Sequence, residues 1–434
     1  MQMTPNFGLK KYEPNDTADL TQIGQNWDII DNQLKAAMDA AAAPARPDSV
    51  SDDAIGNRTP DQTLAPVSPG TGKLGQILSW ITNRLRAITG KANWWDAPTK
   101  SMEQLNSDLT AHLGETVLKA NKTINVPTDF PTIQAALDSL KYTWIPSDVT
   151  VTIQVATGTY THTAPIIINH PCGNQIKIVG ATPVTTTCSA VGTITGSAGN
   201  WSVPITVASS SGIAAGDYVI IKGTAGTGDH YAFRGIWKVI SVDSTTQITV
   251  QNTHRKSVFP TATLSGGTVV ALKTILKFTS SRGIVVASNS ALGFLDQVAV
   301  VGDGSAYGGI LVGRAPSQAV PSPAFVWLGG NVGVNGFGAD GIGAGYGGTV
   351  SAYSDVASSG NGGNGFYAGY GGSISASSST ASGNGGNGFG ANYGGSISAS
   401  SSTASGNGQS GFYAGSGGSI SASSSTASGN GQSG

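Results

Sequence analysis

The last quarter of the chain carries a 23-residue repeat, and this periodicity constrains the fold more than any other feature. Three copies align without gaps over residues 365–387, 388–410 and 411–433, and a looser copy with one extra residue precedes them. Self-similarity at such a period predicts a solenoid, a propeller or an array. Gly and Ser dominate and no helical apolar stripe occurs, which excludes a helical solenoid. A propeller blade needs about 40 residues, and a flexible linker has no reason to repeat Phe and Ile at fixed spacing.

Three short strands separated by turns fit one 23-residue coil. Strand alternation directs five side chains of the first full copy inward: Phe366 and Ala368, Ile374 and Ala376, and Ala381. Gly371-Gly372 and Gly383-Asn384-Gly385 supply the corners, where positive φ angles are expected.

Stacked coils lie about 4.8 Å apart, so residues one period apart form columns. The repeat predicts an aromatic column, an aliphatic column and an amide ladder: Phe366, Phe389 and Phe412; Ile374, Ile397 and Ile420; Asn361, Asn384, Asn407 and Asn430. We therefore predict a mainly β chain whose last quarter winds as a right-handed parallel β-helix with about 23 residues per coil.

The middle of the chain reads as the start of the same β-helix, interrupted once. We expect a cap and first coils over residues 126–200, with a short amphipathic helix at 130–140 that plugs the open end. Strands are predicted at 151–155, 166–168 and 176–180, with a turn at 158–160.

Residues 201–272 show a different pattern of four strands joined by hairpin-length turns. They predict a small antiparallel barrel or sandwich inserted between coils. The β-helix is expected to resume over residues 273–434. The chain ends inside another Gly-Asn-Gly turn without a capping element, so we expect the natural chain or fibre to continue.

The N-terminal third carries the helical patterns. Residues 1–43 are predicted to be an attachment segment with a helix over 20–37, and residues 44–125 a Pro-rich linker followed by helices near 74–88 and 101–113. The first helix has apolar residues at coiled-coil spacing, which fits either an oligomeric seam or an ordinary amphipathic helix packed on a core. Ser101 and Gln104 form a predicted capping box.

Charge is scarce and unevenly placed. The net charge is −1, with 11% charged residues, which argues against a nucleic-acid partner. All 23 Lys and Arg lie at or before Arg314, and only Asp340 and Asp355 are ionisable acids after it. The opening residues have no signal-peptide core, and no apolar run is long enough to cross a membrane. Cys172 and Cys188 could form a disulfide or remain two free thiols.

The sequence offers little for catalysis. Cleavage of a polysaccharide needs two carboxylates, and the repeats contain none; Asp296, Asp303, Asp340 and Asp355 are the candidates upstream, where solitary turn aspartates are the plainer explanation. The five histidines show no metal-ligand spacing, and no cofactor motif occurs, so we predict no catalytic, metal or cofactor site.

Tyrosines recur beside the Gly-Gly corners. Tyr346, Tyr370 and Tyr393 occupy one repeated position, and Ser416 replaces them in the last full copy. An exposed column of Tyr flanked by Ser and Asn could stack on sugar rings and bond their hydroxyls, which makes these three residues the candidate binding site. Packing between coils or against another subunit is the alternative interpretation.

Two resemblances to known families add to this picture. Residues 132–136, 158–160 and 178–180 make the first fifty or so residues of the solenoid resemble the pectin-lyase-like superfamily, including pectin methylesterases and phage tail spikes. That likeness implies a fold rather than an activity. Residues 294–297 depart from the methylesterase aspartate motif, so its catalytic role is not carried over.

The N-terminal layout resembles the tail fibres of phages and phage-tail-like particles. The likeness rests on residues 6–11, 28–31, 53–59, 88–90 and 94–98. It implies a homotrimer in the virion tail, held to tail or baseplate proteins by its N-termini and recognising a glycan or protein on the host surface. The alternatives are a tail spike that depolymerises surface polysaccharide and a bacterial surface adhesin, which the missing signal peptide weighs against.

Overall fold

A computed structural model describes residues 20–41, 59–67, 73–287, 289–305, 307–313 and 323–432. The chain divides into two compact units, residues 1–108 and 109–434. Within the described residues, no helix is long and apolar enough to cross a membrane.

Helices form the first unit and lead into the second. They are α1 (Leu20–Ala41), α3 (Leu74–Thr89) and α4 (Met102–Thr116). The predicted capping box is confirmed, because the Gln104 amide donates to Ser101 Oγ at 3.0 Å and the Ser101 amide donates to Gln104 Oε1 at 2.8 Å. The fibre-like segment at 6–11 and most of the one at 53–59 lie outside the described residues.

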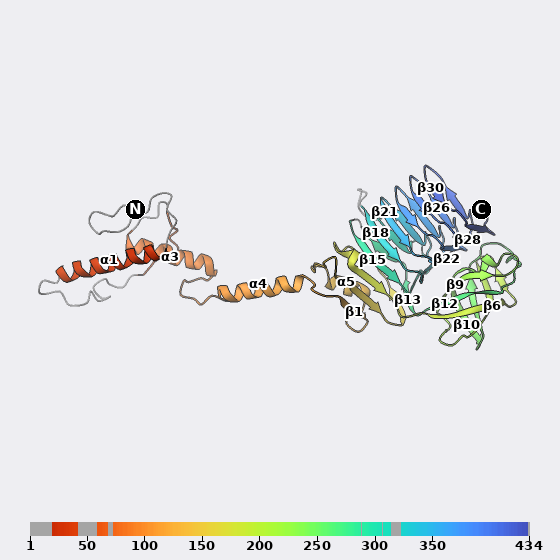
Figure 1. Cartoon of the computed structure of the whole chain (residues 1–434), viewed down its shortest axis with the longest axis horizontal. Helices are drawn as coiled ribbons and strands as arrows, with labels where there is room; N and C mark the ends of the chain where they lie inside the picture. The colour runs from red at the N-terminus through yellow and green to blue at the C-terminus, as the bar shows by residue number, and fades with distance from the viewer. Residues whose placement is uncertain are drawn as a thin grey trace. The chain divides into compact units, whose positions relative to one another are not determined.

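Three parallel sheets wind around one apolar core and form the predicted β-helix (Figure 1). The first sheet contains β1 (Lys122–Val126), β2 (Val151–Val155), β5 (Ile176–Val179), β15 (Ala291–Asp296), β18 (Ala324–Leu328), β21 (Gly348–Ala352), β24 (Ser373–Ser375), β27 (Ser396–Ser398) and β30 (Ser419–Ser421). The second contains β4 (Ile166–Ile168), β14 (Ile284–Val286), β17 (Ile310–Val312), β20 (Ile342–Gly345), β23 (Phe366–Gly369), β26 (Phe389–Ala391) and β29 (Phe412–Ala414). The third contains β3 (Gly158–His162), β13 (Thr274–Phe278), β16 (Val298–Val301), β19 (Val332–Asn335), β22 (Ala357–Ser359), β25 (Thr380–Ser382), β28 (Thr403–Ser405) and β31 (Thr426–Ser428).

The predicted columns are confirmed in the repeats. Phe366, Phe389 and Phe412 stack with centroids 4.9 and 5.0 Å apart. Asn384 accepts from the main-chain and side-chain nitrogens of Asn361, both at 3.0 Å, and donates to Asn407 Oδ1 at 3.0 Å. These amides are buried, so the ladder satisfies polar groups that would otherwise destabilise the interior.

The expected helical plug is α5 (Ile133–Ser139), which packs on β1, β2 and β4. Thr132 caps it by accepting from the Ala135 amide at 3.1 Å, and Ile133, Ala136 and Leu137 are buried against the first coil. The turn expected at 158–160 is instead the start of β3. It pairs with β13. Strand β3 begins with a glycine and none of its five residues is fully buried, so it lacks the apolar alternation that indicates a strand.

The inserted domain is a closed antiparallel barrel rather than a sandwich. Six strands pair in a ring: β6 (Val184–Val191), β8 (Asn200–Val207), β11 (Gln247–Asn252), β10 (Gly235–Ser244), β9 (Tyr218–Ala225) and β12 (Gly266–Leu272). β7 (Thr195–Ser197) forms a hairpin with β8. The barrel thus begins at Val184, earlier than the expected 201, and the first coil begins at Lys122, earlier than 126. The short 3-10 helices η1 (Gly173–Gln175) and η2 (His230–Phe233) complete the described elements.

The barrel docks on the outer face of the third sheet. An apolar seam joins them, made of Ile220, Ile236, Val270, Leu272, Ile275, Ala299, Val301 and Ala357. Polar contacts flank the seam, including Asn335 Nδ2 to the Ile236 carbonyl at 3.0 Å and the Ile236 amide to Ser359 Oγ at 3.2 Å. Apolar burial and matched hydrogen bonds therefore fix the barrel on the coils.

Candidate functional site

The three candidate tyrosines form one stacked column on the surface. Tyr346 and Tyr370 have ring centroids 4.9 Å apart with planes at 3°, and Tyr370 and Tyr393 are also 4.9 Å apart, at 9°. This spacing is that of the coils themselves. Tyr370 is 48% exposed and Tyr393 is 54% exposed. We call Tyr346, Tyr370 and Tyr393 the tyrosine column.

The backbone at this column is held in an unusual conformation. Tyr346, Tyr370 and Tyr393 have φ angles of 52°, 51° and 49°, and each precedes a glycine that also has positive φ. Left-handed backbone costs a residue with a bulky side chain roughly 1 kcal/mol or more, and Gly or Asn would relieve it. The repeat therefore places tyrosine where local backbone preference alone disfavours it.

Stacking leaves the column unequally accessible. Each internal face is covered by the neighbouring ring, so Tyr370 presents its ring edge and hydroxyl. The next coil carries Ser416, at the same left-handed φ of 49°, in place of a fourth ring. Among the described residues, no aromatic ring stacks on the Ser416 side of Tyr393. Tyr393 therefore presents an uncovered ring face at this end of the column.

A groove of about 240 Å³ runs beside the column. Its lining includes Tyr346 and Tyr370 together with Tyr367, Asp340 and Asn364. Asp340 accepts from the Asn364 amide at 2.8 Å and from Asn364 Nδ2 at 2.9 Å, so it starts a second polar ladder. The groove therefore joins aromatic edges to amide and carboxylate groups, a combination that suits a sugar.

The other candidate carboxylates have separate structural partners. Asp296 Oδ1 accepts from the Asn331 amide at 3.0 Å, and Asp355 pairs with Lys222 on the barrel at 3.2 Å. Asp303 accepts from the amides of Ser280 at 2.8 Å and Ser305 at 3.0 Å, and from the Ser305 hydroxyl. The hydrogen bonds from Ser305, and then that from Ser280, lower the pKa of Asp303 to about 2. Its carboxylate is therefore ionised at neutral pH and has no proton to donate.

Histidines and cysteines give no reactive cluster. The described residues include no group of three or more His, Cys, Asp or Glu placed to hold a metal. Cys172 and Cys188 are buried and unpaired, and burial raises the pKa of the Cys188 thiol to about 11. His254 is buried at the contact between barrel and coils, and this burial lowers its pKa to about 4.

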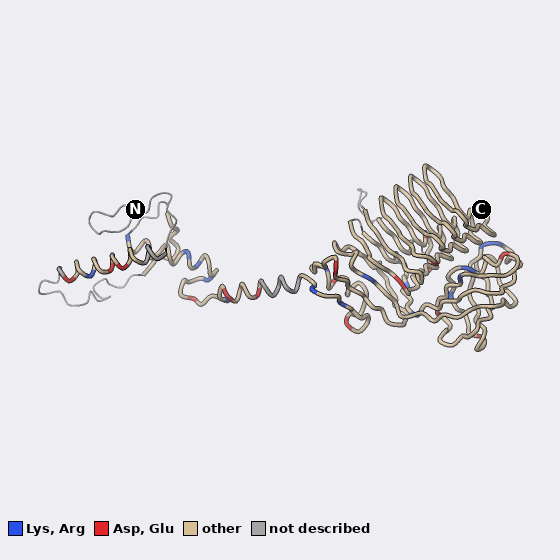
Figure 2. The backbone as a smooth tube through the Cα atoms, in the orientation of Figure 1, with Lys and Arg blue, Asp and Glu red and all other residues tan. Residues whose placement is uncertain are grey.

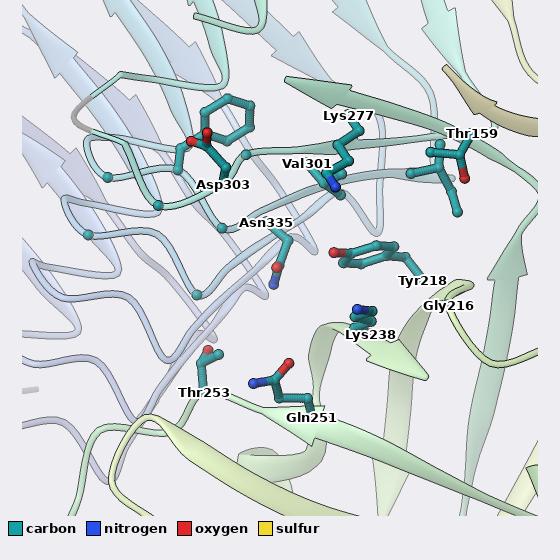
Figure 3. Close-up of a pocket in the computed structure, with 18 of the residues that line it drawn as sticks. Thr159, Gly216, Tyr218, Lys238, Gln251, Thr253, Lys277, Val301, Asp303 and Asn335 are labelled. Carbon is teal, nitrogen blue, oxygen red and sulfur yellow. The ribbon is translucent and has the colours of Figure 1, made fainter. Parts of the chain in front are cut away.

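A cleft of about 750 Å³ lies between barrel and β-helix (Figure 3). One wall is the outer face of the third sheet, where the parallel register places Lys277, Val301 and Asn335 in one row. The glycine-rich corners after these strands complete that wall.

The barrel supplies the opposite wall. Antiparallel register aligns Tyr218, Lys238 and Gln251 across β9, β10 and β11, with Thr253 and Arg255 just beyond β11. Figure 3 shows Lys277 and Asn335 across the cleft from Lys238 and Gln251. Burial raises the pKa of Tyr218, so its hydroxyl stays protonated and able to donate a hydrogen bond.

Charged residues are absent from the coils after Asp355, which Figure 2 shows as an uninterrupted tan tube. Lys238, Arg255 and Lys277 line the cleft with a single described carboxylate, that of Asp303. None of the three cations forms an ion pair with a described residue. The sequence does not predict this site, because its residues lie far apart in the chain. It offers one signal, which is that no Lys or Arg follows Arg314.

No family model matches the sequence, and no curated protein matches it. Among solved structures, the chain is similar to the tailspike gp54 of Acinetobacter baumannii bacteriophage AP22 in complex with A. baumannii capsular saccharide, with 9% identity and a TM-score of 0.20 over 81% of this chain and 61% of that one. The chain thus spans less than two thirds of that tailspike.

Two further structures are similar at the same level. The tailspike gp61 of Pseudomonas phage phi297 shows 12% identity and a TM-score of 0.18 over 79% of this chain and 68% of that one. A glycoside hydrolase shows 8% identity and a TM-score of 0.16 over 72% and 96%. These scores are too low to support an argument about fold or function.

Proposed function

We propose that this chain is a receptor-binding protein of a phage tail or phage-tail-like particle, which recognises a glycan on the host surface through the tyrosine column. The observation that carries this proposal is the left-handed backbone of Tyr346, Tyr370 and Tyr393, together with the high exposure of the last two. Backbone strain that is repeated at an exposed aromatic position indicates selection for the side chain rather than for stability.

The rest of the molecule supports a display role. The repeats carry no charged side chain after Asp355, so a long surface of Ser, Asn, Gly and Tyr faces solvent. Such side chains adapt their hydrogen bonds to sugar hydroxyls, while tyrosine supplies rigid contact area. The amide ladder and the stacked phenylalanines make this surface stiff.

The N-terminal region is proposed to attach to the tail or baseplate and to assemble as a homotrimer. In α1, Trp27 and Leu34 are 65% and 57% exposed, and Ile30 lies between them at coiled-coil spacing. In α3, Ile81 and Ile88 are 51% and 72% exposed. Apolar stripes of this kind favour burial against further copies of the chain. Light scattering should give three times the mass of one chain, and Leu34→Glu should lower it; a monomeric wild type would contradict this part of the proposal.

Recognition through the column is tested by binding to host cells. Labelled protein is measured against a panel of bacteria and their purified surface glycans. Tyr393→Ala should lower affinity about fivefold, since one aromatic contact contributes about 1 kcal/mol.

The matched control is Tyr142→Ala, which removes a tyrosine that is 79% exposed near the capped end of the β-helix. This control should leave binding unchanged. Equal binding by wild type and Tyr393→Ala would overturn the proposed role of the column.

Cleavage of the glycan is the second candidate, and the cleft with Asp303 on its lining is the feature that favours it. A glycosidase needs a second carboxyl group and a protonated acid. Asp303 is the one described carboxylate lining the cleft, and it is ionised. We therefore propose binding without cleavage. Release of reducing sugar from a bound glycan, abolished by Asp303→Asn, would establish the enzyme instead.

A further inference from the structure

We propose that the cleft between barrel and β-helix binds an anionic segment of the host glycan, whose acidic groups are held by Lys238, Lys277 and Arg255. This inference rests on the proposed function, because it names the chemistry of the ligand and a second place where the ligand is held. It concerns a different surface from the tyrosine column.

The positions of the cations are set by both sheets. Lys277 lies on the third sheet next to Val301 and Asn335, and Lys238 lies on the barrel between Tyr218 and Gln251. Neither lysine makes a hydrogen bond or ion pair through its side chain to a described residue. Their ammonium groups are thus available to a ligand in the cleft, from opposite walls (Figure 3).

Arg255 is fixed in place while its guanidinium stays available. Its Nε donates to the Gly383 carbonyl at 3.1 Å, and its main-chain amide donates to the Gly406 carbonyl at 3.0 Å. Thr253 Oγ1 bonds the same Gly383 carbonyl at 3.3 Å. These bonds tie the segment after β11 to two successive coils and leave the terminal nitrogens of Arg255 for a bidentate contact with an oxyanion.

The single acid of the cleft does not neutralise these cations. Asp303 accepts three hydrogen bonds within its own corner, from Ser280 and Ser305. Three cations and one carboxylate line the cleft, and this carboxylate is hydrogen-bonded within its own corner. The cleft is therefore positive, although the net charge of the chain is −1. A positive cleft with low-dielectric walls concentrates anions and speeds their capture.

The remaining lining indicates a sugar rather than a bare ion. Tyr218, Gln251, Asn335 and Thr253 offer hydroxyl and amide groups, and the volume of about 750 Å³ lies within the range of small-molecule sites. The site is also preformed, because the seam and its flanking hydrogen bonds hold the walls together. A preformed site loses less entropy on binding an extended oligosaccharide.

The test uses the full chain and calorimetric titration with defined probes. Oligogalacturonate supplies carboxylates, a glycerol-phosphate oligomer supplies phosphates, and the carboxyl-reduced form of the oligogalacturonate is the neutral counterpart. At least one anionic probe should bind about tenfold more tightly than the neutral one, and the preference should shrink between about 50 mM and about 300 mM salt. Which anionic probe binds more tightly identifies the acidic group.

The variant Lys238→Gln/Lys277→Gln should lose about tenfold of the anionic affinity. The control Lys141→Gln/Lys177→Gln removes the same charge from exposed lysines on the cap and on β5, away from the cleft, and should bind as wild type does. Matching thermal unfolding of the variants shows that both fold. Equal affinity for neutral and anionic probes, or loss of affinity in the control alone, would overturn the proposal.

Two further outcomes separate this inference from its premise. Tighter binding of an oligothymidylate of equal charge than of either anionic glycan would assign the cleft to nucleic acid and overturn it. If cells are bound in a Tyr393-dependent way while no anionic probe binds, the cleft inference fails and the proposed function stands. If cells are not bound at all, the proposed function fails, whatever the cleft binds.

Discussion

The repeat coils and the inserted barrel both bury the apolar side chains of short strands, but they do so in different ways. In the coils, one residue type per position is stacked on itself, as in the column of Phe366, Phe389 and Phe412. In the barrel, a closed ring of antiparallel strands surrounds a mixed core that includes Trp237 and Phe233. Repetition makes the last coils uniform and uncharged, whereas the barrel and the irregular coils before the repeats carry charged residues such as Lys238 and Lys277. An asymmetric site therefore arises where barrel and β-helix meet, along the third sheet.

The largest loss of stability is expected when one asparagine of the amide ladder is replaced. Asn384→Ala deletes four hydrogen bonds, two accepted from Asn361 and one donated to each of Asn407 and the Ser358 carbonyl. The free energy of unfolding should fall by about 4 kcal/mol, because each lost bond leaves a buried partner unsatisfied. Denaturant unfolding measures it. Asn392→Ala, at a side chain without a hydrogen bond to a described residue, is the matched control, and equal losses would refute the ladder as a source of stability.

The junction of the two regions is tested by Ile236→Ala. Ile236 is fully buried in the seam on β10, so truncation should lower the free energy of unfolding by about 3 kcal/mol. Ile240 lies on the same strand and is 45% exposed, so Ile240→Ala should cost less than about 1 kcal/mol. Hydrogen exchange at the backbone amides of β19 and β22 should also be faster in Ile236→Ala than in the wild type. Similar losses in the two variants would mean that the seam contributes little.

Acid should loosen the same junction through His254. Burial lowers the pKa of His254 to about 4, against 6.5 for an ordinary histidine, while Asp229 opposes this shift and Lys256 adds to it. Because the pKa of His254 is lower in the folded state than in the unfolded state, the folded protein keeps its full stability above pH 6.5. The free energy of unfolding then falls as the pH decreases towards about 4. The loss should be about 2 kcal/mol. Unfolding measured at pH 7 and pH 4.5 in wild type and His254→Gln isolates it, and parallel pH profiles would contradict the prediction.

The smallest effect is expected at the tyrosine column. Tyr370→Gly removes two stacking contacts but also relieves the left-handed backbone at φ 51°. The two terms are each about 1 kcal/mol and opposite in sign, so stability should change by less than about 1 kcal/mol. A thermal melt checks this against Phe366→Ala in the interior, which should cost about 3 kcal/mol. A large loss in Tyr370→Gly would mean that the column is built for stability.

The coils could be predicted from the sequence in detail because a solenoid repeats its own contacts. Once the period was known, Phe366, Ile374 and Asn384 each had a neighbour of the same kind one coil away, and the structure has these columns. The capping box at Ser101 and the plug around Ile133 could also be predicted, since both depend on residues a few positions apart.

The cleft could not be predicted, because its residues become neighbours only through long-range pairing. Lys277 and Lys238 face the same cleft because β13 pairs with β3 and because β8 and β11 close the barrel that docks on the third sheet. The strand β3 is not apparent from the sequence for a different reason, since none of its five residues is fully buried. Local alternation and periodicity determined the coils, the columns and the helical cap. Only tertiary structure decided where the barrel lies on the third sheet, and thereby which charges share a site, because that choice rests on the side-chain fit of the Ile236 seam rather than on any pattern along the chain.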